Sequence, residues 1–294
     1  MPKSRVRFGL WWLLGLGSLL VVVLVTAYSL RDELGLGKRP RIGVVEVIGS
    51  FERPEPVLDL LVSLRRDTSI KAIILRIDSP GGAVAPFQEI HREVLKTRRT
   101  KKVVASLGTV AASGGYYVAA AADRIVASPG TATGSIGVIM PLTNLKELMD
   151  KLGVGLTTIK AGRFKDAGVP TRSLTKEERE VFQELVDNVH RQFIRDVAQG
   201  RGLDESKVSK AADGRIMTGE QALGLGLVDQ LGNFQDAIAL AGSLAGLKGE
   251  PEAVWVGRKK ASWLGSLLRD VLSGSLSDLF SKTDLAPGLA AIPR

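Results

Sequence analysis

Short apolar runs alternate with amphipathic stretches between residues 41 and 153. Runs rich in Val and Ile that predict buried strands lie at 41–49, 71–79, 102–110, 123–129 and 134–140. Stretches with apolar residues at helical spacing lie between them, at 56–67, 87–99, 113–122 and 142–153. Repeated strand–helix units joined by short turns predict an α/β layered fold with mainly parallel strands.

A longer charged segment follows this alternation. Its apolar positions recur every four residues and predict one long amphipathic helix over 175–201, with one face formed by Val181, Leu185, Val189, Phe193 and Val197. Shorter helices are predicted at 204–212, 218–225 and 233–247. We therefore assign one domain to residues 41–249 and a tail to 250–294, which contains an amphipathic stretch at 263–280.

The first apolar segment has the length of a membrane anchor. Residues 8–30 contain no charged side chain, and a helix of that length is about 34 Å long, enough to cross the hydrocarbon core of a bilayer. Three basic residues lie within residues 1–7, so the positive-inside rule places them in the cytoplasm and the main domain outside it. We expect a single-pass protein of the cell membrane with a linker at 31–40; a cleaved signal ending near 25–27 is the alternative.

The composition argues against several kinds of site. The chain of 294 residues has no cysteine and two histidines, His91 and His190, so it has no disulfide framework and no thiol nucleophile. Two histidines also argue against a multi-histidine metal site, and we expect no metal and no cofactor. The net charge of +9 comes without aromatics interleaved among basic residues, which argues against a nucleic-acid partner and fits a surface beside anionic lipid.

Two motifs that follow predicted strands bear on chemistry. DSPGG (78–82) can turn the backbone so that amide hydrogens face outward toward an oxyanion, although an ordinary strand-to-helix turn fits it as well. AASGGYY (111–117) places Ser113 at the start of a helix, a position that fits a helix N-cap as well as a nucleophile.

A nucleophilic serine needs a base, and a lysine can serve where histidine is scarce. Lys165 lies in the turn AGRFKDAG (161–168). A lysine base must be neutral, which requires removal of water from the amine and a neutral hydrogen-bond partner to orient it. Ser135, in TGSIGV (133–138), can provide that partner, although a lone lysine in a turn is usually solvated.

The four motifs, in this order and approximate spacing, resemble those of signal peptide peptidase A in its short, single-repeat form. The resemblance implies a fold similar to that of Clp protease and crotonase, and a membrane-bound serine endopeptidase with a Ser–Lys dyad. Carried over to this chain, it implies Ser113 as nucleophile, Lys165 as general base and Ser135 as the residue that orients the base. It also implies the backbone amides of Gly82 and Gly114 as the oxyanion hole, with Gly81 as the alternative to Gly82.

The resemblance further implies partners and substrates. We expect a homo-oligomeric ring in which Ser113 of one subunit meets Lys165 of its neighbour, acting on apolar peptides such as remnant signal peptides. One departure is AGVP (167–170), because relatives often carry a serine before this proline.

Three alternatives remain open. A related membrane protease that cleaves a stomatin-like partner would use the same dyad. A crotonase-like acyl-CoA enzyme would use the same pair of amides but normally a carboxylate base, and a non-catalytic membrane scaffold would leave the motifs without a role. We also consider that residues 285–294, which include the small apolar run 289–292, occupy a neighbouring active site and restrain its activity.

Overall fold

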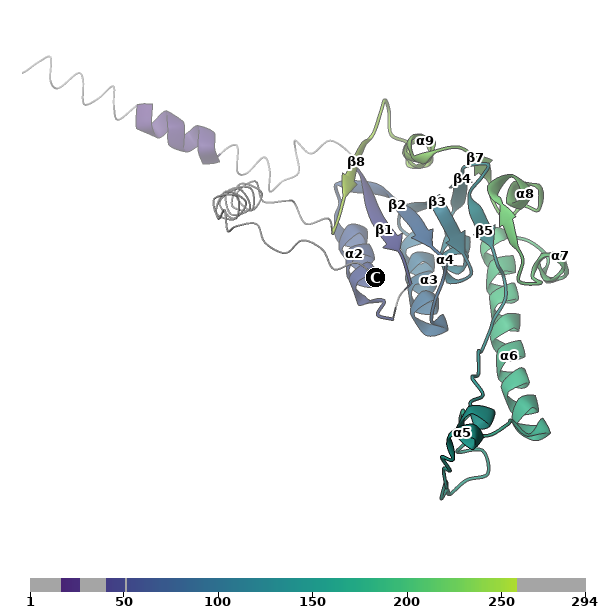
Figure 1. Ribbon diagram of the computed structural model, residues 1–294. Coiled ribbons are helices and arrows are strands. Elements are labelled where there is room, and N and C mark those ends of the chain that lie inside the picture. Colours follow the sequence, from purple (N-terminus) through teal and green to yellow (C-terminus); the bar gives the residue numbers. More distant parts are fainter. Residues whose placement is uncertain (1–16, 27–40, 51, 258–294) are drawn as a thin grey trace, which may run out of the picture. The chain divides into compact units, whose positions relative to one another are not determined.

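The computed structural model describes residues 17–26, 41–50 and 52–257 (Figure 1). Internal contacts divide the chain into Met1–Val256 and Gly257–Arg294, and the fold described below belongs to the first unit. Residues 17–26 are helical and exposed, and no helix among the described residues is long and apolar enough to cross a bilayer. The remainder of the predicted anchor at 8–30, the linker at 31–40 and the tail beyond residue 257 lie outside the described residues.

The described fold is built on one eight-stranded sheet. Its strands are β1 Arg41–Ile48, β2 Ile70–Ser79, β3 Lys102–Ala112, β4 Arg124–Ala127, β5 Ala132–Gly134, β6 Ile216–Thr218, β7 Gln230–Leu231 and β8 Glu252–Trp255. They are ordered β6-β5-β3-β2-β1-β8, and β4 pairs with β3 and β7. Within this sheet β6 alone runs antiparallel to its neighbour. Parallel neighbours require crossover connections, which the predicted strand–helix alternation supplies.

Helices cover both faces of the sheet (Figure 1). They are α2 Glu55–Arg66, α3 Val84–Arg98, α4 Gly114–Ala120, α5 Lys146–Leu152, α6 Lys176–Arg201, α7 Glu205–Ala211, α8 Gly219–Gly224 and α9 Phe234–Leu244. Side chains of β2 alternate between the faces: Ile73, Leu75 and Ile77 join a core with α2, α3, α4 and α6, whereas Ala72 and Ile74 pack with α9. Burial on both faces explains why the central strands are almost continuously apolar.

Local capping signals set the ends of the long helix α6. The Glu178 amide donates to the Thr175 hydroxyl (3.2 Å) and the Thr175 amide donates to the Glu178 carboxylate (3.0 Å), which forms a capping box. Gly202, with φ of 64°, terminates the helix in the left-handed conformation. The helix predicted at 175–201 is confirmed.

The strand predicted at 134–140 is wrong. Strand β5 ends at Gly134, and residues 135–145 form neither strand nor helix. Ser135 has φ of 51°, which interrupts an extended conformation, and Ile139 is 88% exposed. Ile136 of this run still packs in the core, whereas Ile139 and Met140 lie on the surface of the single chain instead of in the sheet.

Three short strands, β6, β7 and β8, were not predicted. Strand β8 pairs with β1, Arg41 lying opposite Glu252 and Val44 opposite Trp255. The sheet therefore continues past residue 249, the end that the sequence gives to the main domain.

Candidate active site

Ser113 lies where β3 passes into α4, in a conformation that side-chain-bearing residues rarely adopt. Its φ is 51° and its ψ is −121°. The Ser113 amide donates to the Gly134 carbonyl, and its carbonyl accepts from the Tyr117 amide, both at 2.9 Å. These bonds hold a backbone strain that typically costs about 1–3 kcal/mol and that gathers at functional sites.

The hydroxyl of Ser113 does not cap the helix that follows it. Helix α4 has no side-chain hydrogen bond to its first turn from Ser113, so the N-cap interpretation of this serine does not hold. Among the described residues no other group is bonded to this hydroxyl. The hydroxyl is therefore free to act on a bound molecule.

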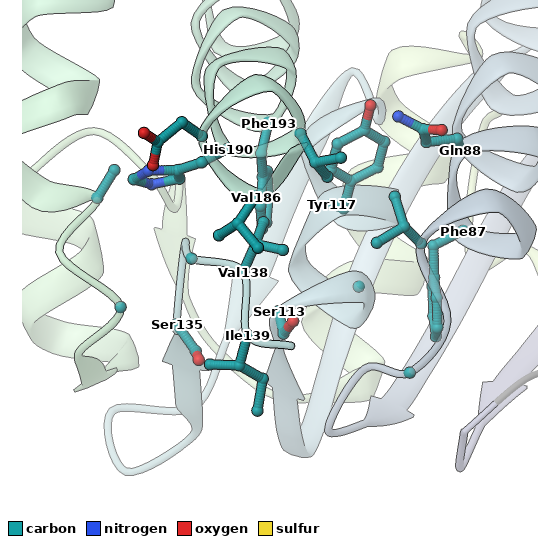
Figure 2. A pocket seen from close by; sticks show the side chains of 18 of the residues that line it. Phe87, Gln88, Ser113, Tyr117, Ser135, Val138, Ile139, Val186, His190 and Phe193 are labelled. Carbon is teal, nitrogen blue, oxygen red and sulfur yellow. The ribbon is translucent and has the colours of Figure 1, made fainter. Parts of the chain in front are cut away.

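Ser135 occupies the matching position on the neighbouring strand. The register pairs Ala112 of β3 with Gly134 of β5, so Ser113 and Ser135 are the next residues on two adjacent parallel strands. The Ser135 amide donates to the Arg215 carbonyl at 2.8 Å. Figure 2 shows both serine side chains at the same pocket. The structure thus brings together two of the predicted site residues.

The turn after β2 packs directly on this serine. Gly81 has φ of +102°, and a Cβ at this position would lie 2.8 Å from the Gly114 amide nitrogen and 3.0 Å from the Ser113 hydroxyl oxygen. Its amide donates to the Ser79 hydroxyl at 3.2 Å, and that hydroxyl donates to the Gly49 carbonyl at 2.5 Å. This close approach requires glycine and fixes the turn against the start of α4.

The two predicted oxyanion donors line the same pocket as Ser113. Gly82 and Gly114 are both lining residues, and neither amide donates to another group within the described part of the chain. The Gly81 amide, by contrast, already donates to Ser79. The geometry therefore favours Gly82 over Gly81 as the partner of Gly114.

The pocket is mainly apolar. It has a volume of about 610 Å³ and lies among α3, α4, α6 and the segment after β5 (Figure 2). Apolar side chains that line it include Val84, Phe87, Tyr117, Ile139 and Phe193. An apolar cavity beside a free hydroxyl and two free amides can hold an apolar side chain of a bound chain next to a reacting carbonyl.

Lys165 lies apart from this pocket in the single chain. It belongs to the turn region between α5 and α6, is exposed, and is not a lining residue. Its side chain has no hydrogen bond or ion pair with any described residue. The structure of one chain therefore brings together Ser113, Ser135, Gly82 and Gly114 and leaves the predicted base outside.

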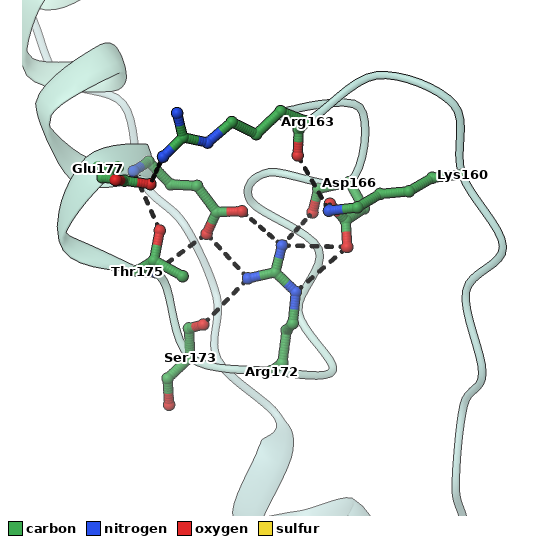
Figure 3. A network of polar contacts seen from close by, with 8 residues as sticks. Lys160, Arg163, Asp166, Arg172, Ser173, Thr175 and Glu177 are labelled. Carbon is green, nitrogen blue, oxygen red and sulfur yellow. Dashed lines mark hydrogen bonds and ion pairs between the residues drawn. The ribbon is translucent and has the colours of Figure 1, made fainter.

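The turn that carries Lys165 is held by a network of charged side chains (Figure 3). Arg172 contacts the carboxylates of both Asp166 and Glu178. The Arg172 guanidinium, followed by the Thr175 amide, lowers the pKa of Glu178 to about 2. A hydrogen bond from Lys160 and then one from Arg172 lower the pKa of Asp166. Both carboxylates are therefore ionised near neutral pH.

His190 is a lining residue that the sequence did not identify. It lies on α6 with its Nε2 atom buried and without a hydrogen-bond partner among the described residues. No hydrogen bond joins its ring to Ser113 or Ser135 in this part of the chain. Its position is on the apolar face predicted for 175–201, but a helical period cannot indicate which turns of that face border a cavity.

The other histidine, His91, packs against the wall of the pocket. Its ring lies 4.7 Å from that of Tyr117, and burial lowers its pKa to about 4. The hydroxyl of Tyr117 donates to Asp196. Among the described residues no group of three or more His, Asp or Glu side chains is placed to hold a metal ion.

Comparison with known proteins adds independent support. Residues 96–248 match Peptidase family S49, and residues 47–133 match Clp protease, with which this mixed α/β sheet is consistent. A candidate protease of Synechocystis is 44% identical over 218 residues, covering 74% of this chain and 78% of that protein. A candidate signal peptide peptidase A of Enterococcus faecium is 36% identical over 240 residues, covering 76% and 68%. The chloroplast serine protease SPPA of Arabidopsis thaliana is 34% identical over 271 residues, covering 87% and 40%. The chain therefore belongs to peptidase family S49, the signal peptide peptidase A family of proteases that its four motifs predict.

Proposed function

We propose that this protein is a membrane-anchored serine endopeptidase that hydrolyses apolar peptides, such as remnant signal peptides, with Ser113 and Lys165 as its dyad. One observation carries the proposal: the strained Ser113, with no capping bond, faces an apolar pocket beside the free amides of Gly82 and Gly114. A packing residue would need neither the strain nor the free donors.

The reaction is an acyl transfer to serine followed by hydrolysis. The neutral amine of Lys165 takes the proton of the Ser113 hydroxyl, whose oxygen attacks the peptide carbonyl carbon. The resulting oxyanion accepts hydrogen bonds from the amides of Gly82 and Gly114, each of which is typically worth about 3–4 kcal/mol in the transition state. Protonated Lys165 gives its proton to the leaving amine as the C–N bond breaks. Water, deprotonated by the same amine, then attacks the ester carbon; the bond to the Ser113 oxygen breaks, the acid product leaves, and Lys165 returns the proton to that oxygen.

A neighbouring copy of the chain supplies Lys165 in this proposal. The pocket of one chain has no lysine among its lining residues, and Lys165 is exposed. Large apolar side chains of the segment that precedes Lys165 in the chain are also exposed: Ile139 (88%), Leu152 (68%), Leu156 (62%) and Ile159 (97%). Such a surface on a folded chain indicates an interface, and a head-to-tail interface that closes makes a ring. Burial of the lysine in that interface would remove water from its ammonium and favour the neutral amine.

The substrate class follows from the pocket and from the expected location. An apolar cavity beside Ser113 favours an apolar residue before the scissile bond. In the proposed arrangement, residues 1–7 are cytoplasmic, residues 8–30 span the cell membrane once, and the sheet domain lies outside the cytoplasm. A protease of a stomatin-like partner would use the same site and would differ in substrate.

The test is hydrolysis of a fluorogenic peptide with an apolar residue before the scissile bond, by the full chain in detergent. We expect Ser113→Ala and Lys165→Ala to abolish turnover while the oligomer stays intact. The matched controls Ser63→Ala and Lys71→Ala replace exposed residues outside the pocket and should act like the parent. Activity retained in Lys165→Ala, or absent from the parent, would refute the proposal.

A further inference from the structure

In the turn between α5 and α6, the basic side chains form ion pairs with carboxylates, with one exception. Among the described residues, each basic side chain of residues 160–172 except Lys165 contacts a carboxylate. The pairs are Lys160 with Asp166, Arg163 with Glu177, and Arg172 with both Asp166 and Glu178. The lysine assigned here as the base is therefore left without a carboxylate partner, although an aspartate is the next residue in the chain.

Arg172 is the centre of this network (Figure 3). Its Nη1 and Nη2 donate to the two carboxylate oxygens of Glu178 at 2.8 and 2.5 Å. Its Nε donates to the carboxylate of Asp166 at 3.3 Å, and Nη2 donates to the Asp166 backbone carbonyl at 3.2 Å. The planar fork of a guanidinium makes this arrangement possible, and an ammonium cannot reproduce it.

The network joins the lysine turn to a rigid helix. The side chains of Asp166 and Glu178 are 10% and 5% exposed, and Glu178 is also bonded within the capping box at the start of α6. Helix α6 provides the Phe193 wall of the pocket. The residue directly after Lys165 is thus tied through one guanidinium to a helix that also shapes an active site.

The same contacts control the charge around the lysine. A carboxylate near an amine favours its protonated form, in which it cannot accept a proton from serine. Asp166 is ionised, and its charge is directed onto Lys160 and Arg172. Lys165 remains unpaired in the described structure. The other charged groups of this turn are all paired: Lys160, Arg163, Asp166, Arg172, Glu177 and Glu178.

We propose that Arg172 is a positioning residue for Lys165: it fixes the turn that presents the lysine and keeps the Asp166 carboxylate away from the amine. This inference rests on the proposed role of Lys165 as the base. Arg172 does not touch substrate in this proposal, and it acts through the turn alone.

The test compares Arg172→Gln, Arg172→Lys and the control Arg163→Gln in the full-length oligomer. The control breaks an ion pair whose side chains are 66% and 58% exposed. We expect Arg172→Gln to lower kcat about tenfold to a hundredfold with little change in KM, as displacement of a reacting group does. The acid limb of kcat/KM should also move to higher pH, because Asp166 then favours the protonated lysine. Arg172→Lys should restore the pH profile but only part of kcat, and Arg163→Gln should match the parent.

Hydrogen exchange provides a readout that does not depend on activity. The amides of Lys165 and Ala167 donate to the carbonyls of Gly162 and Phe164 at 3.3 and 3.1 Å. These amides should exchange faster in Arg172→Gln, while those of β2 and β3 keep the parental rates.

The possible failures are distinguishable. If Lys165→Ala abolishes turnover but Arg172→Gln acts like Arg163→Gln, the proposed dyad stands and the positioning role is refuted. The positioning role is also refuted if kcat of Arg172→Gln falls only in proportion to the loss of oligomer while the acid limb of its pH profile is unchanged. If Lys165→Ala remains active, the proposed function fails and this inference fails with it.

Discussion

Ser113 and Ser135 each lie one residue beyond a register pair of two parallel strands, and both have φ of 51°. Among the described residues they are the non-glycine residues with positive φ. Because β3 and β5 are directly bonded, the two hydroxyl-bearing residues emerge side by side at the same edge of the sheet. The backbone strain is therefore shared by the two serines of the candidate site and is not confined to one loop.

This arrangement predicts a sharp effect at Gly81. Gly81→Ala would place a methyl group 2.8 Å from the Gly114 amide nitrogen, at a φ of +102° that alanine rarely adopts. We expect the turn to shift off the oxyanion site and kcat/KM to fall about a hundredfold, as loss of one such donor does. Peptide hydrolysis measures the effect.

The control for this substitution is Gly130→Ala. A Cβ at Gly130 would meet no atom within 4 Å, so this variant should keep parental activity. Parental kcat/KM in Gly81→Ala would show that the turn does not position the donors.

A second prediction concerns the source of the base. Ser113→Ala subunits keep the lysine, and Lys165→Ala subunits keep the serine, so each pure oligomer should be inactive. If the dyad forms between subunits, mixing equal amounts before assembly should restore about a quarter of parental activity, because one interface in four then combines both residues. Turnover after co-expression and purification of the mixed oligomer measures this.

The control for mixing is the double variant. Ser113→Ala, Lys165→Ala subunits mixed with parental subunits should only dilute the activity. No recovery in the mixture of single variants, with mixed assembly verified by mass, would place the serine and the lysine within one chain.

The long periodic elements could be predicted from the sequence because each is specified locally. Strands β1, β2 and β3 are mainly apolar runs, and α6 has a four-residue apolar period with a capping box at Thr175 and Gly202 after its end. These signals need no knowledge of the rest of the chain. Peptide motifs likewise located Ser113, Ser135, Gly82 and Gly114.

The parts of the fold and site that the sequence did not predict depend on contacts between segments distant in the chain. Strand β7 has two residues and β8 has four, too few for a period, and they exist because β4 and β1 offer unpaired edges. The run expected to form a strand at 134–140 leaves the sheet after Gly134: Ile136 packs in the core, and Ile139 and Met140 are exposed in one chain. The bonds of Arg172 to Asp166 and Glu178 span six residues in each direction and follow neither a helical nor a strand period.

A third prediction tests the apolar pocket as the site of substrate selection. Val186 lies on α6 and lines the pocket (Figure 2). Val186→Trp would fill part of the cavity, so kcat/KM for a peptide with leucine before the scissile bond should fall about tenfold more than that for alanine. Paired hydrolysis assays measure the ratio of kcat/KM for the leucine peptide to kcat/KM for the alanine peptide.

The control is Leu225→Trp, at an exposed residue that does not line the pocket, and it should leave this ratio unchanged. An unchanged ratio in Val186→Trp would show that contacts outside this pocket select the substrate.

The last prediction concerns acid stability. Burial lowers the pKa of His91 from 6.5 to about 4, with the Asp196 charge opposing that shift and Arg98 adding to it. The unfolded chain therefore binds a proton at a higher pH than the folded chain does. The contribution of His91 to the free energy of unfolding is therefore fully present above about pH 6.5. It decreases as the pH falls toward about 4 and does not change below that, and the total loss is about 3 kcal/mol.

His91→Phe keeps a ring against Tyr117 and removes the titration. The free energy of unfolding, measured by denaturant between pH 7 and pH 4, should fall less in His91→Phe than in the parent. Equal losses in both proteins would show that His91 takes up its proton without cost, and hence that its environment is open to water.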